Sequence, residues 1–180
     1  LREVAPVKFF IGILYNESFS KEAILKKLSG VWGAIDAVSD SWPFTFTSYY
    51  EKEMGVTIFR CFVTFQVLKD PAELMIWKGR SNELEKEFET LEWSRPVNLD
   101  PGYFDLGKVI LASTKDHAHR VYLGQGIFGE VTLYAKKGAW ASWPWTYPDY
   151  LDPRYHHFFW DKREEYAQEL KVFWRESKSM

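Results

Sequence analysis

The chain has 180 residues, of which 46% are hydrophobic and 27% charged, and its formal net charge is −2 at pH 7. This balance is typical of a globular protein, and the length suits one domain, so we expect residues 1–180 to form a single domain. A module that binds nucleic acid usually has a strongly basic surface, so the near-neutral charge disfavours such a partner.

The sequence predicts a soluble protein of the reducing cytoplasm, without a membrane partner. No apolar stretch approaches the ~20 residues that a membrane span needs. Residues 1–6 lack the long apolar segment of a signal peptide. The single cysteine, Cys61, excludes a disulfide within the chain. No thiolate-stabilising motif surrounds Cys61, so we interpret it as a structural thiol rather than a nucleophile.

The first elements are a strand and a helix. Residues 7–14 are apolar on both alternating faces except at Lys8 and Gly12, which predicts a central strand covered on both sides. Apolar residues then recur at helical spacing over residues 21–31, and Ser20 before them is a candidate N-cap.

The next elements complete a repeating order of strands and helices. Extended segments are predicted at residues 35–39, 44–48 and 56–68. The sequence Asp70-Pro71-Ala72-Glu73 is typical of a helix start, and this helix should reach about Leu91. Residues 108–113 add a strand. The order β-α-β-β-α-β is that of a ferredoxin-like (split βαβ) core, in which two helices cover one face of an antiparallel sheet.

A β-hairpin and a closing helix are predicted after this core. Residues 119–123 and 127–134 flank the turn Gly124-Gln125-Gly126. The expected register pairs Leu123 with Ile127, Tyr122 with Phe128, and Arg120 with Glu130. A last helix should run from Pro153 to about Arg175. The predicted fold class is therefore α+β, an antiparallel sheet with a ferredoxin-like core, an added C-terminal β-hairpin and a closing C-terminal helix.

Several segments together resemble a bacterial and archaeal family of unknown function, the domain-of-unknown-function family numbered 4416. They are Pro6–Gly12, Tyr49–Gly55, Ser81–Glu85, Val97–Tyr103, Lys115–Leu123 and Trp145–Tyr150. The resemblance covers nearly the whole chain. It implies no activity, cofactor or catalytic residue, because none is established for the family.

The first candidate site segment is Asn98-Leu99-Asp100-Pro101-Gly102-Tyr103. Asp-Pro-Gly is typical of a turn, because proline presets φ and glycine accepts a positive φ. One interpretation is an ordinary loop in which Asp100 bonds its own backbone. The other is a functional loop that presents Asn98, Asp100 and Tyr103 to a ligand.

The second candidate segment carries three kinds of hydrogen-bond donor, on Lys115, His117, His119 and Arg120. Lys115 and Arg120 suit a phosphate or carboxylate. His117 or His119 suits proton transfer near neutral pH, with Asp100 to orient them. The structural alternative is that Arg120 pairs with Glu130 and that His119 packs at a strand end.

A metal site is a further interpretation of the two histidines. On a strand, His117 and His119 would share a face and reach one ion, and Asp100 or Glu130 would add oxygen ligands. The expected hairpin register, however, puts Glu130 on the face opposite His119. The sequence therefore predicts no metal site, and it identifies no cofactor.

Two function classes remain open, because the familiar phosphate-binding and catalytic motifs are absent. In the first, the chain binds a small anionic ligand, such as a phosphorylated metabolite or nucleotide, and acts on it. In the second, it is a non-catalytic interaction or homodimerisation module. The aromatic segment 140–150 fits either class, since its rings suit a ligand groove, an interface or a cover over a sheet edge.

Overall fold

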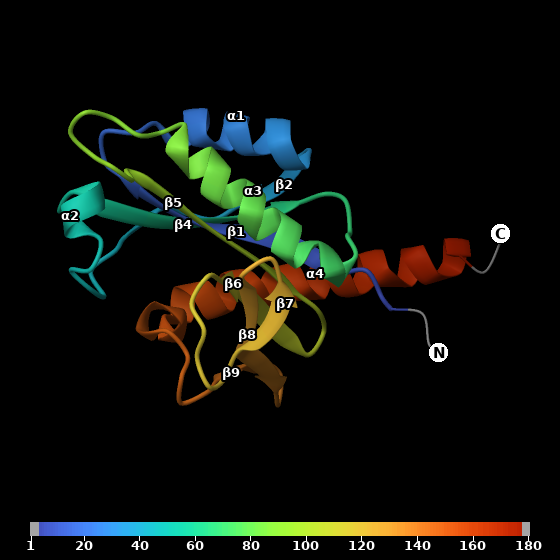
Figure 1. Cartoon of the computed structure of the whole chain (residues 1–180). Helices are drawn as coiled ribbons and strands as arrows, with labels where there is room; N and C mark the ends of the chain where they lie inside the picture. The colour runs from blue at the N-terminus through green and yellow to red at the C-terminus, as the bar shows by residue number, and fades with distance from the viewer. Residues whose placement is uncertain (1–3, 178–180) are drawn as a thin grey trace.

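A computed structural model describes residues 4–177 and places their strands in a nine-stranded sheet (Figure 1). The strand order is β2-β4-β1-β5-β6-β8-β7, with β3 paired to β4 and β9 paired to β8. The strands are β1 (Lys8–Asn16), β2 (Ile35–Val38), β3 (Trp42–Pro43), β4 (Ile58–Phe65), β5 (Val97–Phe104), β6 (Lys108–Ser113), β7 (Val121–Gly124), β8 (Ile127–Lys136) and β9 (Ala139–Ser142). All the paired strands run antiparallel.

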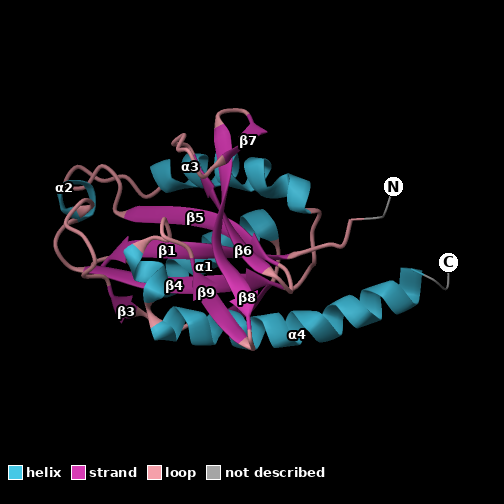
Figure 2. Ribbon diagram, turned by 90° about the horizontal axis from the view of Figure 1, so that it is seen from below, coloured by secondary structure: helices cyan, strands magenta, loops and turns pink. Residues whose placement is uncertain are grey.

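Helices cover both faces of this sheet. They are α1 (Lys21–Trp32), α2 (Glu51–Met54), α3 (Leu74–Lys86) and α4 (Pro153–Ser177), with short 3-10 turns η1 (Pro71–Glu73) and η2 (Pro148–Leu151). Helices α1 and α3 lie on one face, and the long helix α4 lies on the other (Figures 1 and 2). The mixed α+β class and the antiparallel sheet are therefore confirmed. No helix in residues 4–177 is both long and apolar enough to cross a membrane.

Strand β1 is the central strand that its apolar sequence predicts. All nine of its residues are buried. Phe9 and Ile11 pack in the core beneath α1 and α3, whereas Phe10 packs in the core beneath α4. The charge of Lys8 is neutralised inside the protein, because its Nζ lies 2.6 Å from Asp36 and 2.8 Å from Glu169 of α4.

Other predicted elements differ in their bounds. Ser20 caps α1 as expected, since its hydroxyl accepts a hydrogen bond from the Ala23 N–H. Residues 44–48 form no strand, and the short helix α2 after them was not predicted. Helix α3 ends at Lys86 rather than near Leu91, and the residues after Lys86 lead back to β5. Strand β9 is an addition, and it extends the predicted hairpin to the three strands β7, β8 and β9.

The hairpin register is confirmed in part. Tyr122 pairs with Phe128, and their ring centroids lie 5.3 Å apart. Gly124 rather than Leu123 pairs with Ile127, because an irregularity shifts the register next to the turn. All three turn residues, Gly124 to Gly126, have positive φ, so the turn closes one residue later on the first strand than expected.

The segment expected as an Asp-Pro-Gly turn is a strand, so that prediction is wrong. Residues 97–104 form β5, which pairs with β1 along most of its length. Leu99 directs both its N–H and its C=O away from β1, to side chains of α3. Pro101, two residues further, has the same orientation, so its missing N–H falls on the side where no strand requires it.

Strands β5 and β6 separate at this proline. They pair only between Gly102–Phe104 and Val109–Leu111. From Pro101 back to Val97, β5 continues along β1, whereas β6 continues along β8 to Ser113. The sheet therefore opens between β5 and β6, and the candidate site lies in this opening.

Candidate functional site

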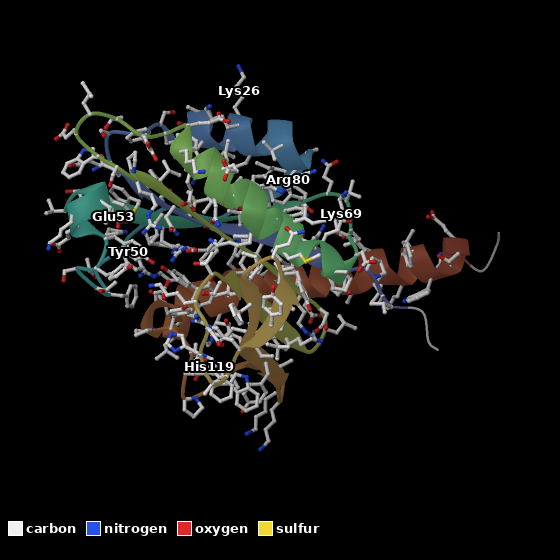
Figure 3. The ribbon with its side chains drawn as sticks, viewed as in Figure 1. Lys26, Tyr50, Glu53, Lys69, Arg80 and His119 are labelled. Carbon is white, nitrogen blue, oxygen red and sulfur yellow. The ribbon has the colours of Figure 1, made fainter. Side chains whose placement is uncertain are left out.

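A cavity of about 560 Å³ lies where β5 and β6 separate. This volume is within the range of small-molecule sites. Its walls come from residues 44–50 before α2, strands β4 and β5, the end of β6 with residues 114–115, and residues 147–150 at η2. Lys78 of α3, Arg95 and Glu130 of β8 complete the lining. Figure 3 shows Tyr50 and Glu53 at the α2 end of the molecule and His119 among the C-terminal strands.

Arg60 of β4 is the buried cation at the floor of this cavity, with 3% of its surface exposed. Its Nη1 lies 3.4 Å from Asp100 Oδ2 of β5, and its Nη2 lies 3.2 Å from Asp149 Oδ2 of η2. To reach Asp100, the side chain passes over β1 at Gly12, which pairs with Asp100. A Cβ on Gly12 would lie 2.9 Å from Arg60 Nη1, so any other residue at position 12 would require this guanidinium or the strand to shift.

The two carboxyl groups beside Arg60 have opposite pKa shifts. Burial alone would raise the pKa of Asp100, but the charges of Lys78 and Arg60 and a hydrogen bond from Asn98 outweigh it and lower that pKa. For Asp149, burial has the larger effect and raises the pKa, although Arg60 opposes it. Carboxyl groups whose environments separate their pKa values in this way suit an acid and a base.

Helix α3 completes the floor from the other side of the opening. Lys78 Nζ donates a hydrogen bond to the Leu99 C=O at 3.1 Å and lies 3.7 Å from Asp100 Oδ1. Glu85 Oε1 accepts a hydrogen bond from the Leu99 N–H at 2.7 Å. Burial raises the pKa of Glu85, although Lys78 and this N–H oppose the shift. Two charged side chains thus satisfy the backbone groups that β6 leaves without a partner.

The rim of the cavity carries an exposed cation and exposed rings. Lys115 Nζ lies 4.9 Å from the ring centroid of Tyr49 and 3.4 Å from its hydroxyl. Across the mouth, Tyr147 keeps 40% of its surface exposed. Burial of the hydroxyl group raises the pKa of Tyr147, against the opposing charge of Arg120.

Arg120 lies behind this rim rather than in the cavity wall. Its Nε donates to Glu130 Oε2 at 2.8 Å, which confirms that the two side chains pair. Its Nη1 donates to the Lys115 C=O at 2.7 Å and its Nη2 to the Tyr147 hydroxyl at 2.5 Å. Arg120 therefore positions two rim residues at once.

The histidines lie outside the cavity lining. His119 Nε2 is 3.1 Å from Glu130 Oε2, so the expectation that these residues lie on opposite faces is wrong. The reason is that His119 precedes β7, where the alternation of a strand does not apply. His117 stacks on His119, and His119 on Trp145, with centroids 5.7 and 5.3 Å apart.

Three of the sequence-predicted site residues meet in the cavity. Asn98, Asp100 and Lys115 all line it, and Asn98 Nδ2 donates to Asp100 Oδ2 at 2.8 Å. Tyr103 does not join them, because it points to the opposite face of β5 and packs near Phe9.

Sequence reasoning missed several cavity residues, which are Arg60, Lys78, Arg95, Asp149 and Tyr49. Two signals were present in the sequence. Arg60 is the only charged residue within β4, and Gly12 interrupts an otherwise apolar central strand. A glycine inside a strand often marks the close approach of another group. The contacts with α3 and η2 have no such signal, since they depend on tertiary packing.

The aromatic segment 140–150 divides between two roles. Trp140 and Tyr150 are buried in the core beneath α4. Trp145 Nε1 donates to the Val131 C=O, and Thr146 Oγ1 donates to the Thr132 C=O. The segment thus covers part of the β8 edge between β7 and β9, and its end at residues 147–150 forms one cavity wall.

Some donors in the cavity walls have no acceptor within the described part of the chain. They are Arg60 Nε, Arg95 Nε and the Tyr150 hydroxyl, and all three atoms are buried. A buried donor without a partner costs roughly 1–3 kcal/mol. Residues 4–177 also contain no group of three or more His, Cys, Asp or Glu side chains arranged to hold a metal ion.

Comparison with known proteins gives one match. Residues 5–166 match a family model described as a domain of unknown function, DUF4416. A search of curated proteins found no match, and neither did a search of solved structures.

Proposed function

The chain belongs to the DUF4416 family, and from that premise we propose that its cavity binds a small anionic ligand, such as a phosphorylated metabolite or nucleotide. The observation that carries the proposal is an excess of hydrogen-bond donors. The cavity lining holds more cations than carboxylates, with Arg60, Lys78, Arg95 and Lys115 against Asp100, Glu130 and Asp149. Guanidinium and ammonium nitrogens can only donate. An anion brings acceptor oxygens and no competing donors, so it matches this surplus.

Lys115 supports the same proposal at the mouth of the cavity. Its Nζ contacts Tyr49, and no Asp or Glu carboxylate of residues 4–177 lies within ion-pair distance of it. The neighbouring cation Arg120 is already paired with Glu130. Lys115 is therefore the rim cation most free to hold an incoming anion.

Any proton transfer in the cavity would fall to the carboxyl groups rather than to the histidines. Asp100 keeps 26% of its side chain accessible, whereas Asp149 keeps 8%. We propose that Asp100 acts as the base and Asp149 as the acid if the bound ligand reacts. His117 and His119, outside the cavity lining, have no part in this proposal.

A thermal-shift screen against nucleotides, sugar phosphates and carboxylates tests the binding proposal. A ligand at about 100 times its dissociation constant should stabilise the fold by about 2.7 kcal/mol. Lys115→Ala should abolish most of that shift. The control Lys26→Ala changes an exposed lysine of α1, far from the cavity (Figure 3). No shift from any anion would contradict the proposal, as would equal shifts in the two variants.

The finer fold assignment belongs with this proposal. We propose that β1, β2, β4 and β5 with α1 and α3 form a ferredoxin-like core, to which the later strands are an extension. Its last strand is then β5 and not residues 108–113 as the sequence suggested, because β5 lies beside β1 and β6 lies outside it. Two features support it, the antiparallel order β2-β4-β1-β5 and the placement of both helices on one face. The prediction of a single cytoplasmic domain stays a prediction.

A second candidate function rests on strand β7 at the end of the sheet. Val121 and Tyr122 are exposed at 69% and 60%, and β7 carries no charged residue. An uncharged edge strand can pair with a second copy of itself, which would make a homodimer. Light scattering of the purified chain and of Val121→Lys decides the matter. A dimer that the substitution dissociates supports pairing, and a monomer contradicts it.

A further inference from the structure

The rim of the cavity narrows the chemistry of the ligand. We infer that the anion is carried by a planar nitrogen heterocycle, as in a nucleotide, rather than by a sugar phosphate or an acyclic metabolite. This inference rests on the proposed anion binding and adds that the ligand carries a heterocyclic ring.

Exposed aromatic rings face the cavity from two separate segments. Tyr49 is 59% exposed and Phe46 37% exposed, both from residues 44–50, while Tyr147 belongs to the wall formed by residues 147–150. Large rings that are exposed in a cavity leave apolar surface in contact with water, and a planar ligand would cover that surface. Stacking on such rings is the common way in which proteins hold a base, because every base has a π-face.

The rim also fixes the anion site next to the ring site. Lys115 Nζ lies 4.9 Å from the Tyr49 ring centroid. One guanidinium, Arg120, holds both the Lys115 carbonyl and the Tyr147 hydroxyl, and Arg120 is itself anchored on Glu130. Arg120 thus holds the backbone of Lys115 and the Tyr147 ring in fixed positions, and the Lys115 ammonium lies beside the Tyr49 ring. A ligand that uses both the cation and a ring needs a short spacer between its charge and its ring, such as the ribose of a nucleoside monophosphate.

The floor favours a heterocycle over a hydrocarbon ring. Asn98, Asp100 and Asp149 bring carboxylate and amide groups to the cavity beside the Arg60 guanidinium. A phenyl ring placed above them would exclude water from these charged and amide groups and offer no hydrogen bond in its place, which is costly. Ring nitrogens and exocyclic amino or keto groups supply both the donors and the acceptors that such a floor can pair.

The test compares whole nucleotides with their halves by isothermal calorimetry. The probes are the four ribonucleoside 5′-monophosphates, the matching nucleosides and ribose 5-phosphate. At least one nucleotide should bind at least about fivefold more tightly than ribose 5-phosphate. Tyr147→Leu should weaken the binding of that nucleotide by a similar factor and leave the affinity for ribose 5-phosphate unchanged. Tyr147→Phe keeps the ring and should therefore retain the tighter binding of the nucleotide. Tyr122→Leu, an exposed tyrosine of β7, is the control.

The outcomes separate this inference from the proposed function. One outcome is that ribose 5-phosphate binds as tightly as every nucleotide and that Lys115→Ala weakens the binding of all of them. That result supports anion binding in the cavity and overturns the inference that the ligand carries a heterocycle. If none of the phosphate compounds binds, the nucleotide inference is overturned, and the carboxylates of the thermal-shift screen then decide the anion site separately. Melting temperatures measured without ligand show whether Tyr147→Leu is folded. If it is unfolded, Tyr49→Leu gives the same comparison from the other wall, because Tyr49 is more exposed.

Discussion

Gly12 of β1 and Arg60 of β4 are matched in shape, because a Cβ on residue 12 would lie only 2.9 Å from Arg60 Nη1. The same Cβ would lie 3.1 Å from the Phe62 ring. Adding a side chain at position 12 must therefore displace Arg60 from its two carboxylates, or displace the strand.

Gly12→Ala should lower the free energy of unfolding by about 1–3 kcal/mol, as overpacking in a core does. Urea denaturation measures the change. The control is Gly30→Ala in α1, where no atom lies within 4 Å of the added Cβ. Since alanine is the better helix former, this control should gain about 0.5–1 kcal/mol. A Gly12→Ala variant as stable as the wild type would show that the contact relaxes at no cost.

Removal of the Arg60 guanidinium should be more damaging. Arg60→Met leaves Asp149, whose side chain is 8% exposed, without its cation. Loss of one partner of a buried ion pair costs about 3–5 kcal/mol. The double variant Arg60→Met with Asp149→Asn should recover part of that loss, since no uncompensated charge remains there. If the double variant is no more stable than the single one, an unpaired Asp149 is not the cause of the stability loss in Arg60→Met.

Asp100 and Asp149 should respond to pH in opposite ways. The pKa of Asp100 is lowered from its ordinary value of 3.8. Its ionised form therefore stabilises the fold above pH 3.8, and that contribution is lost as the pH falls through the lowered pKa. The pKa of Asp149 is raised, so its ionisation costs stability once the pH rises above 3.8 and through the raised value.

Two variants separate these effects. Asp100→Asn should fall further below the wild type as the pH rises through the lowered pKa toward 3.8, and the difference should then stay constant. Asp149→Asn should instead gain on the wild type as the pH rises from 3.8 through the raised pKa of Asp149. Urea midpoints measured between about pH 2 and pH 7 give both trends. Parallel curves for the two variants would refute the opposite shifts.

Glu85 accepts a hydrogen bond from the Leu99 N–H, and we expect this bond to contribute more to the free energy of unfolding than the charge of Glu85 does. Glu85→Gln retains an oxygen for the Leu99 N–H and should change the free energy of unfolding by less than about 1 kcal/mol. Glu85→Ala leaves that buried N–H without an acceptor and should cost about 1–3 kcal/mol. Hydrogen exchange at the Leu99 amide should accelerate in the alanine variant alone. Equal exchange rates in both variants would show that another group takes over.

Arg120 should contribute more to the stability of the fold than an exposed cross-strand ion pair would. Its side chain is 3% exposed and that of Glu130 is 1% exposed, so Arg120→Ala should cost about 3–5 kcal/mol. The exposed pair of Lys86 and Glu83 is the control, and Lys86→Ala should lower the free energy of unfolding far less than Arg120→Ala does. A small cost at Arg120 would mean that water enters and solvates Glu130.

Much of the fold follows from local sequence. The double-faced apolar pattern of β1, the cap at Ser20 and the glycine turn between β7 and β8 all express local rules. Strand β5 does not, because Asp100-Pro101-Gly102 has the composition of a turn. Only tertiary pairing with β1 and the side chains of α3 make it a strand.

The candidate site was less accessible to prediction for a related reason. Asn98, Asp100 and Lys115 lie in the two polar segments that the sequence singles out, residues 98–103 and 115–120. Arg60 and Asp149 come from segments far apart in the chain and meet only after the sheet and η2 have packed. No local pattern encodes such a meeting, although the glycine at position 12 marks where it takes place.

Helix α4 has a consequence for how the chain is made. Phe10 and Phe62 are covered by Phe159 of this last helix, with ring centroids 4.7 and 4.9 Å apart. Every strand from β1 to β5 is synthesised before that helix exists. On the ribosome, the N-terminal half can fold its α1–α3 face early, while the opposite face stays apolar and open to aggregation. The apolar face that carries Phe10 and Phe62 is therefore covered only after helix α4 has been synthesised.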